Sequence, residues 1–246
     1  MIEFRNVTKK FGEQTILKNL NLKIEEGKIL FILGTSGTGK SVLLKNIVGL
    51  MRPESGQILI DSEDVSNFSE EDFFAIRKKC GMVFQQPALF DSLNVFENIA
   101  FGLRRQSALS ELEITEKVRQ ALQLVHLTHV EQKWPAELSF GMQKRVSLAR
   151  TLALNPKVLL FDEPTTGLDP LTTKAINQLI QELSKKLNTT SVVVSHDMNC
   201  ALEIADRIVV LDRGEIVEQG SPKDLEKSKV PLVQDFLRDV MESDNP

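Results

Sequence analysis

Short, almost wholly apolar runs alternate with amphipathic segments along this chain. The runs KILFIL (28–33), KVLLFDEP (157–164) and SVVVSHD (191–197) each predict a buried strand, and helical patterns follow at 40–51, from 170 and from 198. Strands that are apolar at successive positions suit a parallel sheet with helices on both faces. The pattern therefore predicts an α/β fold.

Other segments extend this pattern. The chain from Val95 to Trp134 is helical and more polar, with no strand signal, and predicts an inserted helical lobe. A helical pattern, LVQDFLRDVM, lies near the C-terminus and either docks on a neighbour or packs locally. Further strands are predicted at 2–11, 20–24, 56–61 and 80–86, with a hairpin-like segment at 207–220.

Bulk composition narrows the functional classes. The 246 residues, 41% of them apolar, suffice for one large domain or for one domain with an inserted lobe. A formal charge of −4 argues against a nucleic-acid partner or an anionic-lipid coat. Cys80 and Cys200 fit no metal or redox spacing, so we expect reduced thiols in a cytosolic protein.

Hydropathy predicts no segment that enters a membrane. No apolar run approaches the roughly 18 residues that span a bilayer, and the N-terminus MIEFRNVTKK lacks the apolar region of a signal peptide. We therefore expect a chain that stays inside the cell and acts on a membrane only through a partner.

The segment GTSGTGKS fits the phosphate-binding pattern G-x-x-x-x-G-K-[ST] in the context that supports it, after a strand and before a helix. Glycines let the backbone wrap so that successive N–H groups face a phosphate. Lys40 brings a positive charge to the β- and γ-phosphates, and Ser41 offers a hydroxyl to Mg²⁺. The predicted loop comprises Gly34, Thr35, Ser36, Gly37, Thr38, Gly39, Lys40 and Ser41.

The segment KVLLFDEP supplies a second part of such a site. Its strand delivers Asp162 and Glu163 at a C-terminal end, where α/β sheets place their ligands. Asp162 can hold Mg²⁺ through its water shell, and Glu163 can polarise a water for in-line attack on the γ-phosphate. Pro164 keeps Glu163 out of the helical region.

Three more residues are candidates because of their positions at strand ends or turns. Gln85 follows the strand CGMVF and can contact Mg²⁺ or the attacking water, and His196 ends SVVV, where its imidazole can hydrogen-bond the γ-phosphate. Phe11 precedes a turn and can stack on adenine. His126 and His129, in the helical lobe, receive no role.

The segment LSFGMQKR raises a separate question. Ser139 before an amphipathic basic run predicts a helix start, whose N–H groups attract an anion. The phosphate-binding loop lies about a hundred residues earlier, so one chain carries two candidate anion sites.

In their order, these motifs resemble the ATP-binding subunits of ABC transporters over about 2–220. Phe11 matches the aromatic A-loop, GTSGTGKS the Walker A, Gln85 the Q-loop, LSFGMQKR the signature, VLLFDEP the Walker B, GLDP the D-loop and His196 the switch histidine. The resemblance implies a P-loop NTPase fold: a RecA-like core with a mixed sheet, an antiparallel β-subdomain and an inserted helical subdomain. It also implies a transport-coupled ATPase that uses ATP and Mg²⁺.

The resemblance answers the question of the second anion site. Such subunits pair head to tail around two ATP molecules, so Ser139 and Gly141 would point at the γ-phosphate held by Lys40 of a second copy, and Asp169 would cross the same interface. Phe140 is a departure, since the family pattern LSGGQ has glycine there, and Met142 replaces its glutamine. Because Ser139 and Gly141 are retained, we expect Phe140 to affect how readily two copies close around ATP more than it affects ATP hydrolysis itself.

The finer resemblance is to the ATPases of bacterial Mla/Mce-type lipid transport systems. It rests on GKSV, PALFDSLNVFENI and VQDFLRD. It implies a multi-span membrane permease near Gln85 to Asn98, an Mce-domain partner, and a peripheral location on the cytoplasmic face of the inner membrane. Two alternatives stay open, the ATPase of a polar amino acid or other small-solute importer and a soluble ABC ATPase of an assembly machine.

Domain boundaries follow from the same resemblance. We expect one ATPase domain over 1–228, with the helical subdomain at about 90–150 inserted in it. A C-terminal helical tail is expected over 229–246.

Overall fold

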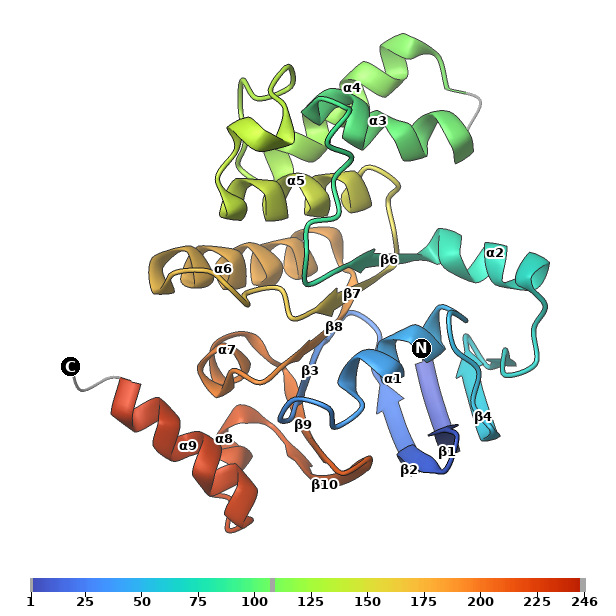
Figure 1. Ribbon diagram of the computed structural model, residues 1–246, viewed down its shortest axis with the longest axis vertical. Helices are drawn as coiled ribbons and strands as arrows, with labels where there is room; N and C mark the ends of the chain where they lie inside the picture. The colour runs from blue at the N-terminus through green and yellow to red at the C-terminus, as the bar shows by residue number, and fades with distance from the viewer. Residues whose placement is uncertain (1, 107–108, 244–246) are drawn as a thin grey trace.

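A six-stranded sheet forms the centre of the molecule in the computed structural model, which describes residues 2–106 and 109–243 (Figure 1). The strand order is β10-β9-β3-β8-β7-β6, parallel except for β10, which pairs antiparallel with β9 at one edge. The strands are β3 (Ile29–Leu33), β6 (Cys80–Val83), β7 (Val158–Asp162), β8 (Thr190–Ser195), β9 (Arg207–Asp212) and β10 (Glu215–Gly220).

A second, antiparallel sheet lies beside the first. Its order is β2-β1-β4-β5, formed by β1 (Ile2–Phe11), β2 (Gln14–Ile24), β4 (Ser55–Ile60) and β5 (Glu63–Asp64). The strand predicted at 20–24 is longer than expected, because a tight turn lets Gln14 pair directly with Phe11 and the ladder then continues to Ile24. The strand predicted at 80–86 is shorter and ends at Val83.

Nine α-helices are assigned within the described residues. The helices next to the sheet are α1 (Lys40–Ile47), α6 (Pro170–Leu187) and α7 (Met198–Ile204), and α2 (Glu70–Lys79) leads into β6. The predicted lobe contains α3 (Val95–Gln106), α4 (Glu111–Leu124), a 3₁₀ turn (Pro135–Glu137) and α5 (Phe140–Leu152). At the C-terminal end lie α8 (Pro222–Leu225) and α9 (Pro231–Ser243).

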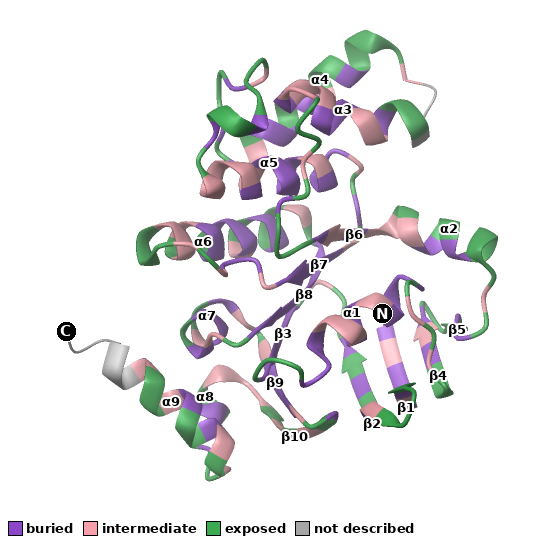
Figure 2. Cartoon of the chain, in the orientation of Figure 1, coloured by how far each residue is buried: buried purple, intermediate pink, exposed green. Residues whose placement is uncertain are grey.

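Two apolar cores lie on opposite faces of the central sheet, and successive strand residues alternate between them. Phe31 and Leu33 join the core shared with the helical lobe, α6 and α7, whereas Leu30 and Ile32 join the core that α1 shares with the antiparallel sheet. The central strands are coloured mostly as buried in Figure 2. Burial on both faces explains why these strands are continuously apolar. The predicted α/β architecture, with mixed and antiparallel sheets, is confirmed.

The C-terminal helix α9 packs locally, which was one of the two expectations for this segment. Val233 and Phe236 are buried in the core of the sheet and helical lobe, and α9 contacts α7. Residues 244–246 of the predicted tail lie outside the described residues.

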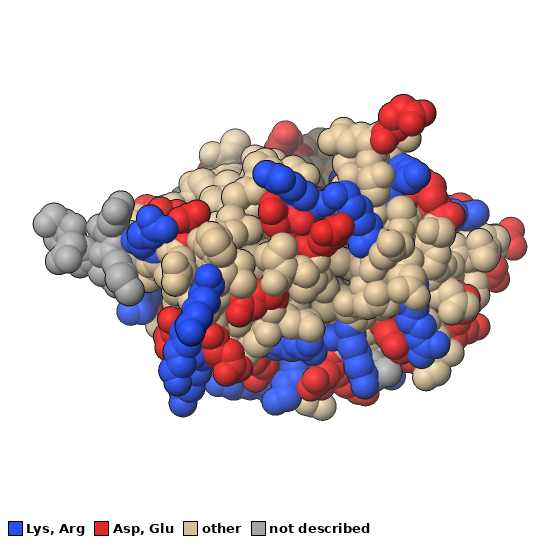
Figure 3. Space-filling view, turned by 90° about the horizontal axis from the view of Figure 1, so that it is seen from below, with Lys and Arg blue, Asp and Glu red and all other residues tan. Residues whose placement is uncertain are grey.

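Surface charge is mixed on the face shown in Figure 3, where basic and acidic side chains are interspersed. Within the residues that the structure describes, no helix combines the length and apolar character required to cross a membrane.

A buried asparagine organises the loop between β6 and α3. The side chain of Asn98 is fully buried, accepts the N–H of Phe90 (2.8 Å) and donates to the carbonyls of Phe90, Leu93 and Asn94 (2.9–3.1 Å). One side chain thus contacts four backbone groups of the loop, although the carbonyls of Phe90 and Asn94 each also accept a backbone N–H. This loop lies in the segment predicted to meet the membrane partner.

Replacing Asn98 by alanine is expected to destabilise the protein by on the order of 2–3 kcal/mol, because several hydrogen bonds to the loop backbone are lost together. Asn94→Ala is the matched control: its side chain accepts the first-turn N–H of Glu97 (2.8 Å) and donates to exposed Gln132 at 3.4 Å, and losing such a cap costs about 1 kcal/mol. Urea unfolding of both variants measures the difference. Equal losses would show that Asn98 has no special role in the loop.

Candidate active site

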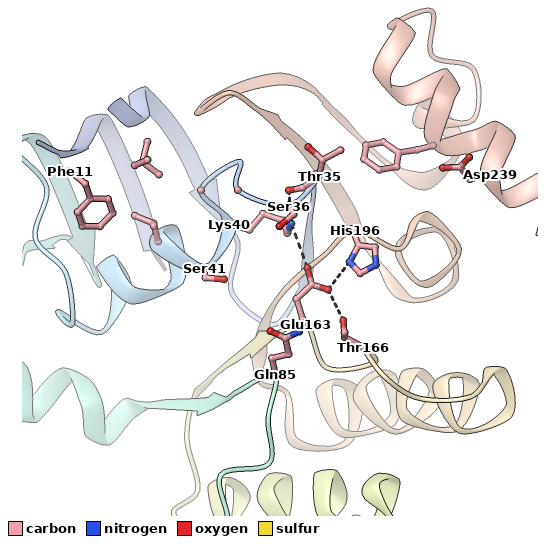
Figure 4. Close-up of a pocket in the computed structure, with 15 residues that line it drawn as sticks. Phe11, Thr35, Ser36, Lys40, Ser41, Gln85, Glu163, Thr166, His196 and Asp239 are labelled. Carbon is pink, nitrogen blue, oxygen red and sulfur yellow. Dashed lines mark hydrogen bonds and ion pairs between the residues drawn. The ribbon is translucent and has the colours of Figure 1, made fainter. Parts of the chain in front are cut away.

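A cavity of about 670 Å³ opens where β3, β7 and β8 of the central sheet end (Figure 4). This is the edge at which α/β sheets bind ligands, and the volume is typical of small-molecule sites. The lining residues are Phe11, Ile16, Thr35, Ser36, Gly37, Gly39, Lys40, Ser41, Val42, Gln85, Glu163, Thr166, His196, Phe236 and Asp239.

The predicted phosphate loop forms one wall of the cavity. Gly37 and Gly39 adopt φ values of 82° and 105°, which L-residues with side chains rarely adopt, and Gly39 precedes the first turn of α1. A Cβ on Gly34 would lie 2.5 Å from the carbonyl oxygen of Leu211. The Thr38 hydroxyl donates to the Thr35 carbonyl at 2.9 Å and braces the loop. The glycines are therefore required by backbone shape and close packing.

Lys40 is the cation of this wall. Its side chain is only 7% exposed, and Nζ donates to the carbonyls of Gly34 (2.8 Å) and Thr35 (2.9 Å). The same Nζ lies 3.5 Å from Oε1 of Glu163. A buried ammonium held among carbonyl oxygens is pre-positioned to receive phosphate oxygens.

Glu163 is the centre of the hydrogen-bond network at the site. Ser195 Oγ donates to its Oε2 at 3.0 Å. Thr166 Oγ1 also donates to Oε2 at 3.0 Å, and His196 Nδ1 lies 3.0 Å from the same oxygen (Figure 4). Two of the predicted catalytic residues, Glu163 and His196, are therefore in direct contact. Ser195 and Thr166 were not predicted, because a serine in a strand and a threonine in a turn carry no distinctive sequence signal.

The oxygen atoms of Ser41 and Asp162 fit a magnesium site. Ser41 Oγ donates to Asp162 Oδ1 at 2.7 Å, and Gln85, although it lies two residues beyond the end of β6, lines the same cavity. Hydroxyl, carboxylate and amide oxygens are hard donors of the kind that Mg²⁺ prefers, together with water and substrate phosphates. The three predicted metal ligands are thus brought to one region.

Phe11 and Ile16 also line the cavity. The Phe11 ring is 48% exposed, and Lys9 Nζ lies 5.2 Å from its centroid. An exposed ring beside an apolar side chain provides a surface on which a planar base can stack.

The predicted signature and D-loop residues lie outside this cavity. Ser139 caps α5 by accepting the N–H of Met142 (3.3 Å), which confirms the predicted helix start. Asp169 caps α6 in the same way, and the hydroxyl and N–H of Thr172 hold the pKa of the Asp169 carboxyl below its usual range. Neither Ser139, Gly141 nor Asp169 lines the cavity of its own chain.

Three further residues near the site were not predicted. Phe236 and Asp239 of α9 line the cavity, and Asp239 lies on the side of Thr35 and His196 (Figure 4). Lys144 of α5 is buried and donates to the carbonyl of Pro164 (2.7 Å), directly after the Walker B strand. All three come from segments distant in sequence, so only the tertiary structure brings them to the site.

Comparison with known proteins gives a consistent result. A family model described as "ABC transporter" matches residues 17–166, and one described as "AAA domain, putative AbiEii toxin, Type IV TA system" matches residues 134–201. The chain is 42% identical over all of its residues to the intermembrane phospholipid transport system ATP-binding protein MlaF of Haemophilus influenzae, of which it covers 92%.

Other relatives reach the same identity. The probable ribonucleotide transport ATP-binding protein mkl of Mycobacterium leprae is 42% identical over 96% of this chain and 68% of its own length. The Fe(3+) ions import protein FbpC of Escherichia coli O157:H7 is 42% identical over 91% of this chain and 63% of its own. Among solved structures, the dimeric ATP-binding cassette MJ0796 bound to ADP and Pi has a TM-score of 0.82 and 36% identity, covering 90% of this chain and 99% of that one.

Replacing Lys40 by alanine is expected to weaken ATP binding by about 1.5–3 kcal/mol, roughly tenfold to a hundredfold in Kd, because a charge-assisted contact is lost. Lys45→Ala, at the other end of α1, is the matched control and should bind ATP as the unaltered chain does. Titration calorimetry measures both affinities. Unchanged affinity in Lys40→Ala would remove Lys40 from the site.

Proposed function

This chain belongs to the ABC transporter family as an ATP-hydrolysing subunit, and from that premise we propose that it drives phospholipid transport across the bacterial cell envelope. In this proposal it closes on a second copy of itself around ATP and transmits that closure to a membrane permease. The observation that carries the lipid assignment is the extent of the match to MlaF, which covers the whole of this chain and 92% of MlaF.

The residues at the cavity support a division of labour in hydrolysis. Lys40 and the phosphate loop would hold the phosphates, and Glu163 would accept the proton of the attacking water. His196, 3.0 Å from Glu163, would orient that carboxylate and contact the γ-phosphate. Ser41, Asp162 and Gln85 would hold Mg²⁺, which when bound offsets the charge of the phosphates.

Pairing of two copies is supported by the position of the second helix start. Ser139 and Gly141 lie outside the cavity of their own chain, and the N-terminus of α5 is electrostatically suited to an anion. In a head-to-tail pair this terminus would face the γ-phosphate bound by the other copy. The dimeric ABC cassette structures, 36–37% identical to this chain, give independent support.

Lipid cargo is favoured over small solutes because the sequence match to MlaF covers more of the relative's length, not because its percentage identity is higher. FbpC is as similar in percentage, but the match spans 63% of that protein, against 92% of MlaF. A small-solute importer remains the second candidate on the strength of that equal identity. In this proposal the permease, not the ATPase subunit, binds the cargo, so the identity of the permease decides between the two candidates.

Glu163→Gln is expected to bind ATP yet hydrolyse it at least about a hundredfold more slowly, because the general base is lost. The variant should also accumulate as an ATP-bound pair, detected by size-exclusion chromatography with light scattering. Glu182→Gln, which removes an exposed carboxylate on α6, should keep the unaltered rate. Normal turnover in Glu163→Gln would show that Glu163 is not the base.

Affinity purification of the chain from detergent-solubilised membranes of its own host is expected to recover a multi-span permease together with an Mce-domain protein. Phe90→Asp should lose both while keeping its ATP affinity, because Phe90 is exposed in the loop held by Asn98. Recovery of a permease with a solute-binding protein would support the importer instead. Recovery of no membrane protein would contradict a transport function.

A further inference from the structure

Glu163 has an unusual backbone conformation. Its φ is 49°, in the left-handed region that costs an ordinary residue about 1–2 kcal/mol. The residue that follows is Pro164, which has no N–H to donate to a neighbouring strand. A strained backbone persists at such a site only where its surroundings hold it, so the contacts of residues 163 and 164 are informative.

The N–H side and the side chain of Glu163 are held by elements close to the cavity. Its N–H donates to the carbonyl of Val194 in β8 at 2.9 Å, and Ser195, Thr166 and His196 contact its carboxylate. On the carbonyl side, the Glu163 carbonyl accepts the N–H of Thr166 at 3.4 Å, and a further contact comes from outside the cavity. Lys144 Nζ donates to the buried carbonyl of Pro164 at 2.7 Å and lies 3.4 Å from that of Glu163.

Lys144 comes from α5, the helix that begins at Ser139, and reaches 163–164 from outside the cavity. It is 5% exposed, and the Phe140 ring covers its Nζ with a centroid distance of 5.2 Å. Burial lowers the pKa of Lys144 to about 8, with the Glu163 carboxylate acting in the opposite direction. A buried ammonium is costly to keep, yet here it satisfies two carbonyls that lie next to the base.

We propose that Lys144 is a positioning residue for hydrolysis: it fixes the left-handed backbone of Glu163 through the carbonyls of residues 163 and 164. It does not line the cavity. This inference rests on the proposed role of Glu163 as the base. It goes further because the orientation of Glu163 would then depend on α5. The N-terminus of the same helix would face the nucleotide bound by the partner copy.

The effect of removing Lys144 follows from this geometry. Lys144→Met keeps the length and the apolar stem but leaves the Pro164 carbonyl unpaired, which frees the Glu163 backbone to relax. Displacement of a catalytic group by about 1 Å can cost on the order of a hundredfold in rate. We therefore expect kcat to fall at least about tenfold, while the ATP concentration for half-maximal rate stays within about twofold.

A double-mutant cycle separates positioning from general support of the fold. In single-turnover assays, Lys144→Met should slow the unaltered protein but not slow Glu163→Gln further, because its effect acts through the Glu163 carboxylate. Thr151→Val is the matched control. It removes another buried hydrogen bond of α5, to the carbonyl of Ser147 at 3.1 Å, and should leave kcat within about twofold of the unaltered value.

Each result of this cycle decides the matter. An unchanged kcat in Lys144→Met overturns the inference, as does an equal further loss in the Glu163→Gln background or a parallel change in half-maximal ATP concentration. If Lys144→Met fails to fold, Lys144→Gln, which retains an N–H donor, is tested by the same criteria and should lose less activity than Lys144→Ala. Equal rates for Glu163→Gln and the unaltered chain would instead remove the proposed role of Glu163 as the base, and this inference with it.

Discussion

The contact between Lys40 and Glu163 is the constraint around which the site is built. These two side chains leave different strands of the central sheet, β3 through its loop and β7 directly, and their charged atoms lie 3.5 Å apart with both side chains largely buried. Parallel strands with a common carboxyl edge bring them together. The order of the strands, the glycine-rich loop and the buried apolar strands together place the Lys40 ammonium and the Glu163 carboxylate next to each other.

Lys40 and Glu163 have different kinds of hydrogen-bond partners. Backbone carbonyls of its own loop surround Lys40, whereas Glu163 is surrounded by side chains of β8, the following loop and the turn after β7. A buried charge needs hydrogen bonds as well as an opposite charge. The network therefore serves stability and chemistry together, because the contacts that offset burial also aim the carboxylate.

Sequence reasoning reached the residues whose type is dictated by chemistry. Gly39, Lys40 and Glu163 stand in patterns that few other structures require, so their positions, and with them the parallel sheet, were predictable. Ser195 and Lys144 were not, because a serine at the end of a strand and a lysine in a basic helix are ordinary there. Their roles depend on which elements pack together in the fold. They also depend on the φ of 49° at Glu163, which no local sequence pattern predicts.

Phe140 shows how a departure from the family pattern is accommodated. Its ring turns toward its own subunit, over Lys144 and within 3.5 Å of the position a Cβ on Gly167 would take. Ser139 keeps an extended backbone, with φ −61° and ψ 157°, and still caps α5. A bulky residue at this position therefore does not require the helix start to change. It adds instead an apolar cover for a buried ammonium, which strengthens the hydrogen bonds of that ammonium by excluding water. Phe140 thus affects the contact between Lys144 of α5 and the backbone at residues 163 and 164, which lies within one chain and does not depend on a second copy.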